Sequence, residues 1–186
     1  MVTRTALLDS AERAARRRGF DAFSYADLSR EVGIRKASIH HHFPVKADLA
    51  FGLIERYALR FSETLATIDR NHDRAADKIR AYVRVYRDAL SEGSQLCLCV
   101  AFSAGRESLS DPVLNELNQF HEDSVAWLEQ VFVLAKEDGS IRGLGSPGSE
   151  ASAALALMEG AQLMARAANN LTPFDQATQA FTARLS

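Results

Sequence analysis

The chain has few cysteines, few prolines and no long apolar run. Of its 186 residues, two are cysteine and four are proline, and aromatic side chains make up 8%. Two cysteines so close in sequence cannot build a disulfide framework, which agrees with a reducing compartment. No apolar stretch approaches the roughly eighteen residues of a membrane span, and the first residues lack the apolar segment of a signal peptide. These absences favour a cytoplasmic protein.

A large net charge is also missing, but the two parts of the chain differ in sign. The formal net charge is −2. Residues 1–60 hold eleven Lys and Arg against seven Asp and Glu, and the remaining residues hold eleven against seventeen. The basic N-terminal part on an acidic remainder suggests that the first part faces a polyanion, although an uneven solvated surface would give the same balance.

Apolar residues recur at helical spacing along most of the chain, and no stretch alternates as a half-buried strand does. The sequence therefore predicts an all-α protein of about nine helices. Ser24 with Asp27, and Thr172 with Asp175, have the spacing of a helix capping box. A loop rich in glycine is expected at 139–149. The expected helical segments are 3–18, 25–32, 36–42, 46 to about 69, 75–90, an apolar segment near 96–106, 111–138, 150–168 and one from 173 onward.

Two short predicted helices, 25–32 and 36–42, have the arrangement of a helix-turn-helix. Gly33 breaks the first, and Pro44 stops the second because its ring forbids a further helical turn. Ile39 and Phe43, four residues apart, would anchor one side of the second helix, which leaves the other side free to enter a DNA major groove. That free side carries Arg35, Lys36, Ser38, His40, His41 and His42.

These side-chain types suit DNA. Arginine and lysine donate to guanine edges, and serine and histidine can bond a base or a phosphate. Lys46 adds a cation at the start of the next helix, a typical phosphate position. A solvated polar helix in a structural bundle would show the same pattern, so this alternative stays open.

The triple histidine at residues 40–42 also raises the possibility of a metal site. Neighbouring side chains on a helix point about 100° apart, so the three cannot converge on one ion. No spaced His or Cys pair completes a site, and no histidine is placed beside a candidate nucleophile. We expect no metal, no cofactor and no catalytic site.

The stretch GFDAFSYADLSREVGIRKASIHHHFPVKADL, residues 19–49, resembles the N-terminal signature of the TetR family of transcriptional repressors. The resemblance covers about residues 3–60, and the remainder is only generically similar. It implies a three-helix DNA-binding head over residues 1–46, with its recognition motif at about 24–43 and a linking helix to about 60. It also implies a helical bundle for ligand binding and dimerisation over residues 47–186.

The resemblance implies DNA contacts at matched positions. Ser24 and Tyr25 would face phosphates, with Ala26 near the groove. His40 stands where the family usually has a tyrosine, and Ser29 replaces a frequent alanine, a change that should be benign. Because histidine changes charge between about pH 5 and 8, phosphate binding at His40 would depend on pH. The other implied DNA-binding residues are Arg35, Lys36, Ala37 and Ser38 in the base-facing turn, followed by His41, His42 and Lys46.

The resemblance further implies a homodimer formed by the last two long helices. Two recognition helices would then bind half-sites about 34 to 36 Å apart on a near-palindromic operator. The penultimate helix carries a small, smooth face that suits this role, and equally suits ordinary core. The expected interface residues are Ala153, Ala154, Leu157, Gly160, Ala161, Met164, Ala168, Phe174 and Phe181.

Regulators of this family bind a small-molecule effector among the helices of the bundle. Effector and operator then oppose each other through a coupling of about 1 to 3 kcal/mol. Each candidate lining residue would also serve as plain core. The candidates are Tyr82, Tyr86, Phe102, Phe120, His121, Trp127 and Met158.

Cys97 and Cys99 would diverge on a helix, so we expect no bond between them. Buried, reduced cysteines are the expectation, and an oxidisable thiol switch is the alternative. The whole sequence predicts a sequence-specific DNA-binding transcriptional regulator, most simply a homodimeric repressor released from its operator by a small molecule. A helical interaction or scaffold protein that does not bind DNA is the competing hypothesis.

Overall fold

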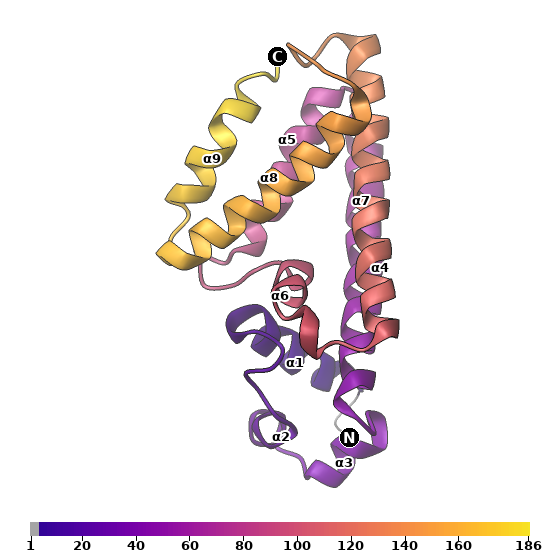
Figure 1. Cartoon of the computed structure of the whole chain (residues 1–186), viewed down its shortest axis with the longest axis vertical. Coiled ribbons are helices and arrows are strands. Elements are labelled where there is room, and N and C mark those ends of the chain that lie inside the picture. Colours follow the sequence, from indigo (N-terminus) through magenta and orange to yellow (C-terminus); the bar gives the residue numbers. More distant parts are fainter. Residues whose placement is uncertain (1–3) are drawn as a thin grey trace. The chain divides into compact units, whose positions relative to one another are not determined.

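The structure is a computed structural model that describes residues 4–186. Within these residues it contains nine α-helices and one short 3-10 helix, Arg106–Ser108, and its only β feature is one isolated bridge between Ile141 and Leu185. The predicted all-α fold class is confirmed. The helices are α1 (Arg4–Arg18), α2 (Tyr25–Val32), α3 (Lys36–His42), α4 (Lys46–Asn71), α5 (Ala75–Ala89), α6 (Leu98–Ala104), α7 (Asp111–Asp138), α8 (Pro147–Ala168) and α9 (Thr172–Thr182) (Figure 1).

Local sequence sets the boundaries of the two short helices α2 and α3. Asp27 accepts hydrogen bonds from both the backbone N–H and the hydroxyl of Ser24, at 2.8 and 2.7 Å, which confirms the predicted cap of α2. Gly33 ends α2 with a φ of 74°, a conformation that suits glycine, and its N–H donates to the carbonyl of Ser29. The hydroxyl of Ser29 in turn donates to the carbonyl of Ile34. The serine that replaces a frequent alanine thus ties the turn together.

The first compact unit contains α1, α2, α3, the first half of α4 and residues 98–119. Its core consists of apolar side chains from every one of these helices. Arg56 of α4 binds Asp9 and Glu12 of α1, at 2.7 and 2.8 Å, so an ion-pair network joins the same two helices. The most deeply buried side chains include Leu7, Ala11, Leu28, Ile39, Phe43, Leu49, Leu53 and Phe102.

The second compact unit contains residues 60–97 and 120–186, with α8 and α9 packed side by side (Figure 1). The buried side chain of Gln162 joins three segments, because it accepts from the N–H of Cys97 and donates to the carbonyl of Tyr86. Asp138, at the end of α7, accepts from the N–H of Ala75 and so caps α5. The predicted boundary after residue 46 separates a DNA-binding part from a ligand-binding and dimerisation part. It is a boundary of function and not of packing, so the two compact units do not test it and it stays a prediction.

The predicted capping box of the last helix is wrong. The carboxylate of Asp175 binds the guanidinium of Arg87 at 2.7 and 2.9 Å instead of turning back to Thr172. The amide oxygen of Asn170 accepts from the N–H of Thr172 and fills that place. Within residues 4–186, none of the helices combines the length and apolar character needed to cross a membrane.

Candidate nucleic-acid interface

Helix α3 presents one buried side and one exposed side. Ile39 has no exposed surface, and Phe43, directly after the helix, is 1% exposed. Both side chains lie in the core of the first unit, so they fix the rotation of the helix about its own axis. All seven predicted DNA-binding residues of this segment are exposed: Arg35, Lys36, Ala37, Ser38, His40, His41 and His42.

The start of α2 lies beside α3 through Tyr25. The phenol oxygen of Tyr25 is 2.9 Å from the carbonyl oxygen of Phe43 and 2.8 Å from that of Val45. Burial, with a smaller contribution from Asp48, raises the pKa of Tyr25 to about 12. The single hydroxyl proton is therefore used inside the protein, and Tyr25 positions the end of α3. Its neighbours Ser24 and Ala26 are exposed and half-buried respectively.

His40 is held between Tyr25 and the turn that follows α3. Its ring centroid lies 4.9 Å from that of Tyr25, with the two planes at 67°. Its Nδ1 lies 3.1 Å from the carbonyl oxygen of Pro44. The residue as a whole is exposed to solvent.

Lys46 has an internal role that the sequence did not reveal. Its ammonium donates to the carbonyl of Phe20 at 2.7 Å and lies 4.5 and 4.9 Å from the ring centroids of Phe20 and Phe23. Burial lowers the pKa of this lysine, with the opposing effect of Asp21 smaller. The two aromatic residues after α1 were a visible signal, since ring faces attract cations. At least one of the three N–H bonds of the ammonium is thus used inside the protein.

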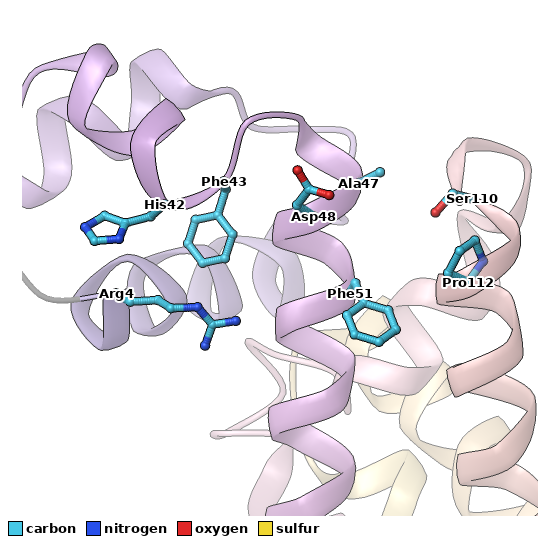
Figure 2. A pocket seen from close by; sticks show the side chains of 8 residues that line it. All are labelled: Arg4, His42, Phe43, Ala47, Asp48, Phe51, Ser110 and Pro112. Atoms are coloured by element: carbon cyan, nitrogen blue, oxygen red, sulfur yellow. The ribbon is translucent and has the colours of Figure 1, made fainter.

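A pocket of about 420 Å³ lies at the end of α3 in the same unit. Figure 2 shows the guanidinium of Arg4 below the ring of Phe43, and it lies 5.2 Å from the ring centroid. Sequence reasoning did not single out Arg4, which adds a cation on the same side as His42. The lining residues are Arg4, His42, Phe43, Ala47, Asp48, Phe51, Ser110 and Pro112.

Six of the seven predicted effector-binding residues lie together in the second unit. The rings of Tyr82 and Trp127 stack, with centroids 5.5 Å apart and planes at 22°, and the ring centroids of Tyr82 and Tyr86 are 5.0 Å apart. His121 binds Glu159 at 3.1 Å. Phe120 is 3% exposed and Met158 is fully buried.

Two of the predicted effector-binding residues, His121 and Phe102, have further contacts. The hydrogen bond that His121 donates to the carboxylate of Glu159 raises the pKa of His121 despite partial burial. Phe102 is the exception to the grouping, because it lies in the first unit, where its ring centroid is 5.2 Å from that of Phe20.

The predicted dimer residues divide between the surface and the interior of α8 and α9. Ala154, Ala161 and Phe174 are at most 2% exposed and pack inside this chain. Met164 is 58% exposed, and its neighbour Leu163 is 47% exposed. Ala153 and Ala168 are exposed, and Leu157, Gly160 and Phe181 are half-buried. Spacings of three and four place the exposed members of α8 on one side of the helix.

Cys97 and Cys99 are both buried, and neither forms a disulfide. Cys97 belongs to the second unit, near Tyr86 and His121, whereas Cys99 belongs to the first. The predicted burial is confirmed, and the thiol-switch alternative stays a prediction.

Comparison with known proteins shows which families and structures this chain is similar to. Residues 7–53 match the family described as "Bacterial regulatory proteins, tetR family". The HTH-type transcriptional repressor NemR of Escherichia coli is 27% identical over 94% of this chain and 89% of its own. A TetR-family regulator from Agrobacterium tumefaciens superimposes with a TM-score of 0.92 at 29% identity, over 98% of this chain and 96% of its own. A TetR regulator from Legionella pneumophila gives 0.87 at 26% identity, over 100% and 98%.

The matched residues include the whole helix-turn-helix, and the similar structures extend over both compact units. Residues 7–53 thus match the tetR family of bacterial regulatory proteins, and the whole chain is similar in sequence and fold to DNA-binding transcriptional regulators of that family.

Proposed function

We propose that the protein is a homodimeric repressor that binds a near-palindromic operator and is released from it by a small-molecule effector. The observation that carries this proposal is the pair Ile39 and Phe43, which lock α3 with its polar, basic side exposed. A helix held in this way can enter a major groove without rotating away from the bases. As such a regulator it would act in the cytoplasm.

In this proposal the residues of the head divide into three tasks. Arg35, Lys36, Ala37 and Ser38 would face base edges, because the first turn of a recognition helix lies deepest in the groove. Ser24, Ala26, His41 and His42 would line the flanking backbone, with Tyr25 positioning the end of α3. Lys46 would bind a phosphate with the N–H bonds that Phe20 leaves free. Residues 1–46 would form this DNA-binding part and residues 47–186 the ligand-binding and dimerisation part.

Helix α8 supports the proposed dimer. Its exposed side combines small residues, Ala153 and Gly160, with the large apolar side chains of Leu163 and Met164. Small residues allow two helices to approach closely, and apolar side chains gain free energy when a second copy covers them. The buried residues Ala154 and Ala161 would instead hold α8 against its own chain.

The aromatic group of the second unit supports the proposed effector site. Ligand sites are mostly apolar with a few polar groups that fix orientation. The rings of Tyr82, Tyr86, Phe120 and Trp127 supply the first, and the His121–Glu159 pair supplies the second. Quenching of Trp127 fluorescence during titration with candidate molecules would detect occupancy.

The deciding experiment is in-vitro selection of duplex DNA by the purified protein. A repressor of this kind should recover a near-palindrome, and its affinity should fall steeply with salt. Lys36→Ala should relax preference at particular base pairs by about 1 to 3 kcal/mol each. Absence of salt-sensitive duplex binding under all conditions would favour the scaffold alternative.

A further inference from the structure

The protein fixes where the proton of neutral His40 resides. Nδ1 of His40 is 3.1 Å from the carbonyl oxygen of Pro44. A carbonyl oxygen can only accept a hydrogen bond, so the hydrogen is on Nδ1. In a neutral imidazole the other ring nitrogen then carries a lone pair and no hydrogen. Nε2 of neutral His40 is therefore an acceptor.

The ring is also held in orientation. The ring of Tyr25 packs edge-on against it, and the phenol oxygen of Tyr25 is itself bound to the carbonyls of Phe43 and Val45. The two nitrogens point to opposite sides of an imidazole. Because Nδ1 is directed at Pro44, Nε2 is directed away from the protein, and the residue is exposed.

His40 lies in the last turn of α3, where a helix docked by its first turn meets the sugar-phosphate backbone. Phosphate oxygens only accept hydrogen bonds, so the lone pair of neutral Nε2 would repel them. A protonated ring keeps its bond to Pro44 and offers a positively charged N–H to the phosphate. We propose that His40 binds an operator phosphate through Nε2 only as the imidazolium, so that operator binding takes up a proton at this residue. The proposal rests on the proposed operator binding.

Other ionisable groups surround His40 and determine which control is needed. Tyr25 of α2 stays neutral in this range, since its pKa is about 12. Asp48, at the start of α4, accepts from the N–H of Val45. On α3 itself, Lys36 lies one turn earlier and His41 follows directly. Because His41 and His42 are further imidazoles in the same turn, the pH dependence of the parent alone does not isolate His40.

Two substitutions isolate it. His40→Asn places an amide N–H where Nδ1 stands, so it can keep the bond to Pro44 while it lacks Nε2 and does not titrate. His40→Tyr offers a hydroxyl that donates at every pH between 5.5 and 8.5. Both leave His41 and His42 in place. The affinity of each full-length protein for the selected duplex is measured by fluorescence anisotropy at fixed ionic strength across this range.

The parent should bind about fivefold more tightly than His40→Asn at pH 5.5, the size of one exposed ion pair, and the two should be equal at pH 8.5. The ratio of His40→Tyr to His40→Asn should not change with pH. Nitrogen NMR of the free parent at pH 8.5 should place the hydrogen on Nδ1.

A parent-to-Asn ratio that is the same at both pH values, or a hydrogen on Nε2, overturns the proposal while operator binding stands. If no variant binds duplex DNA with salt dependence, the proposed function fails, and this inference fails with it.

Discussion

Lys46 offers the most direct test of how the head is built. The change Lys46→Met keeps an unbranched apolar stem over the rings of Phe20 and Phe23 but removes the ammonium. The protein then loses the 2.7 Å bond to the Phe20 carbonyl and the two cation–ring contacts at 4.5 and 4.9 Å. It should be less stable for this reason, apart from any effect on DNA.

The expected size follows from these contacts. A hydrogen bond from a charged donor contributes about 1.5 to 3 kcal/mol and an exposed cation–ring contact about 0.5 to 1 kcal/mol. Lys46 is half-buried and its desolvation opposes these gains, as its lowered pKa indicates. We therefore expect a net loss of about 1 to 2 kcal/mol in the free energy of unfolding. For a chain of this length the Tm should fall by roughly 2 to 8 °C.

Lys36→Met is the matched control, since it removes the same charge from an exposed lysine of α3. Its unfolding free energy should change by no more than about 0.5 kcal/mol. Unfolding in urea is followed by far-ultraviolet circular dichroism, because the only tryptophan, Trp127, lies in the second unit and does not report on the head. Lys46→Met should lower the log–log salt slope of operator binding by about 1, whereas Lys36→Met should relax the preference for particular base pairs. Equal urea midpoints for the two variants would show that the Phe20 contact contributes no stability, and the reasoning would be refuted.

Two further predictions concern the second unit. Glu159→Gln should remove the stabilisation that comes from the raised pKa of His121. This contribution is complete below about pH 6.5 and is lost as pH rises through the raised pKa. In urea titrations, the free energy of unfolding of the parent should therefore exceed that of the variant by about 1 kcal/mol more at pH 6 than at pH 9. An equal difference at both pH values would contradict this. Gly93 has a φ of 84° and an added Cβ would lie 2.5 Å from the backbone nitrogen of Asn170, whereas Gly143 has a φ of 63° and open space around it. Thermal unfolding should show a loss of about 1 to 2 kcal/mol for Gly143→Ala and a clearly larger one for Gly93→Ala, and equal losses would mean that the backbone contact is not rigid.

Much of the fold could be predicted because single residues control its boundaries. Gly33 and Pro44 end α2 and α3 where the sequence places these ends, and Ser24 with Asp27 starts α2 as their spacing requires. These effects act over three or four residues, so they need no knowledge of the tertiary structure. The stripe of Ile39 and Phe43 likewise predicts which side of α3 is buried.

Predictions failed, or became less informative, where the contacts of a side chain depend on a residue far away in the sequence. Asp175 has the spacing of a cap, but Arg87, 88 residues away in the sequence, captures its carboxylate in a bidentate pair. Phe102 has an aromatic side chain of the kind that lines effector sites, yet its ring packs on the ring of Phe20 in the first unit. In α8, spacing could not separate Ala154 and Ala161, which pack inside the chain, from the exposed side.

The head also shows why a DNA-binding motif is hard to divide into contacts by mutation. Tyr25 and Lys46 occupy positions expected to bind phosphates, yet both donate to backbone carbonyls of their own chain. The bond of Tyr25 holds the turn after α3, at Phe43, and the bond of Lys46 holds the segment between α1 and α2, at Phe20. Removing either group should therefore disturb the packing of the head as well as any phosphate contact, and affinity alone would overstate their part in binding. Arg35 and Lys36 are exposed, so affinity lost at these positions measures contact with DNA. Stability and affinity must be measured together at the first pair, whereas affinity alone is informative at the second.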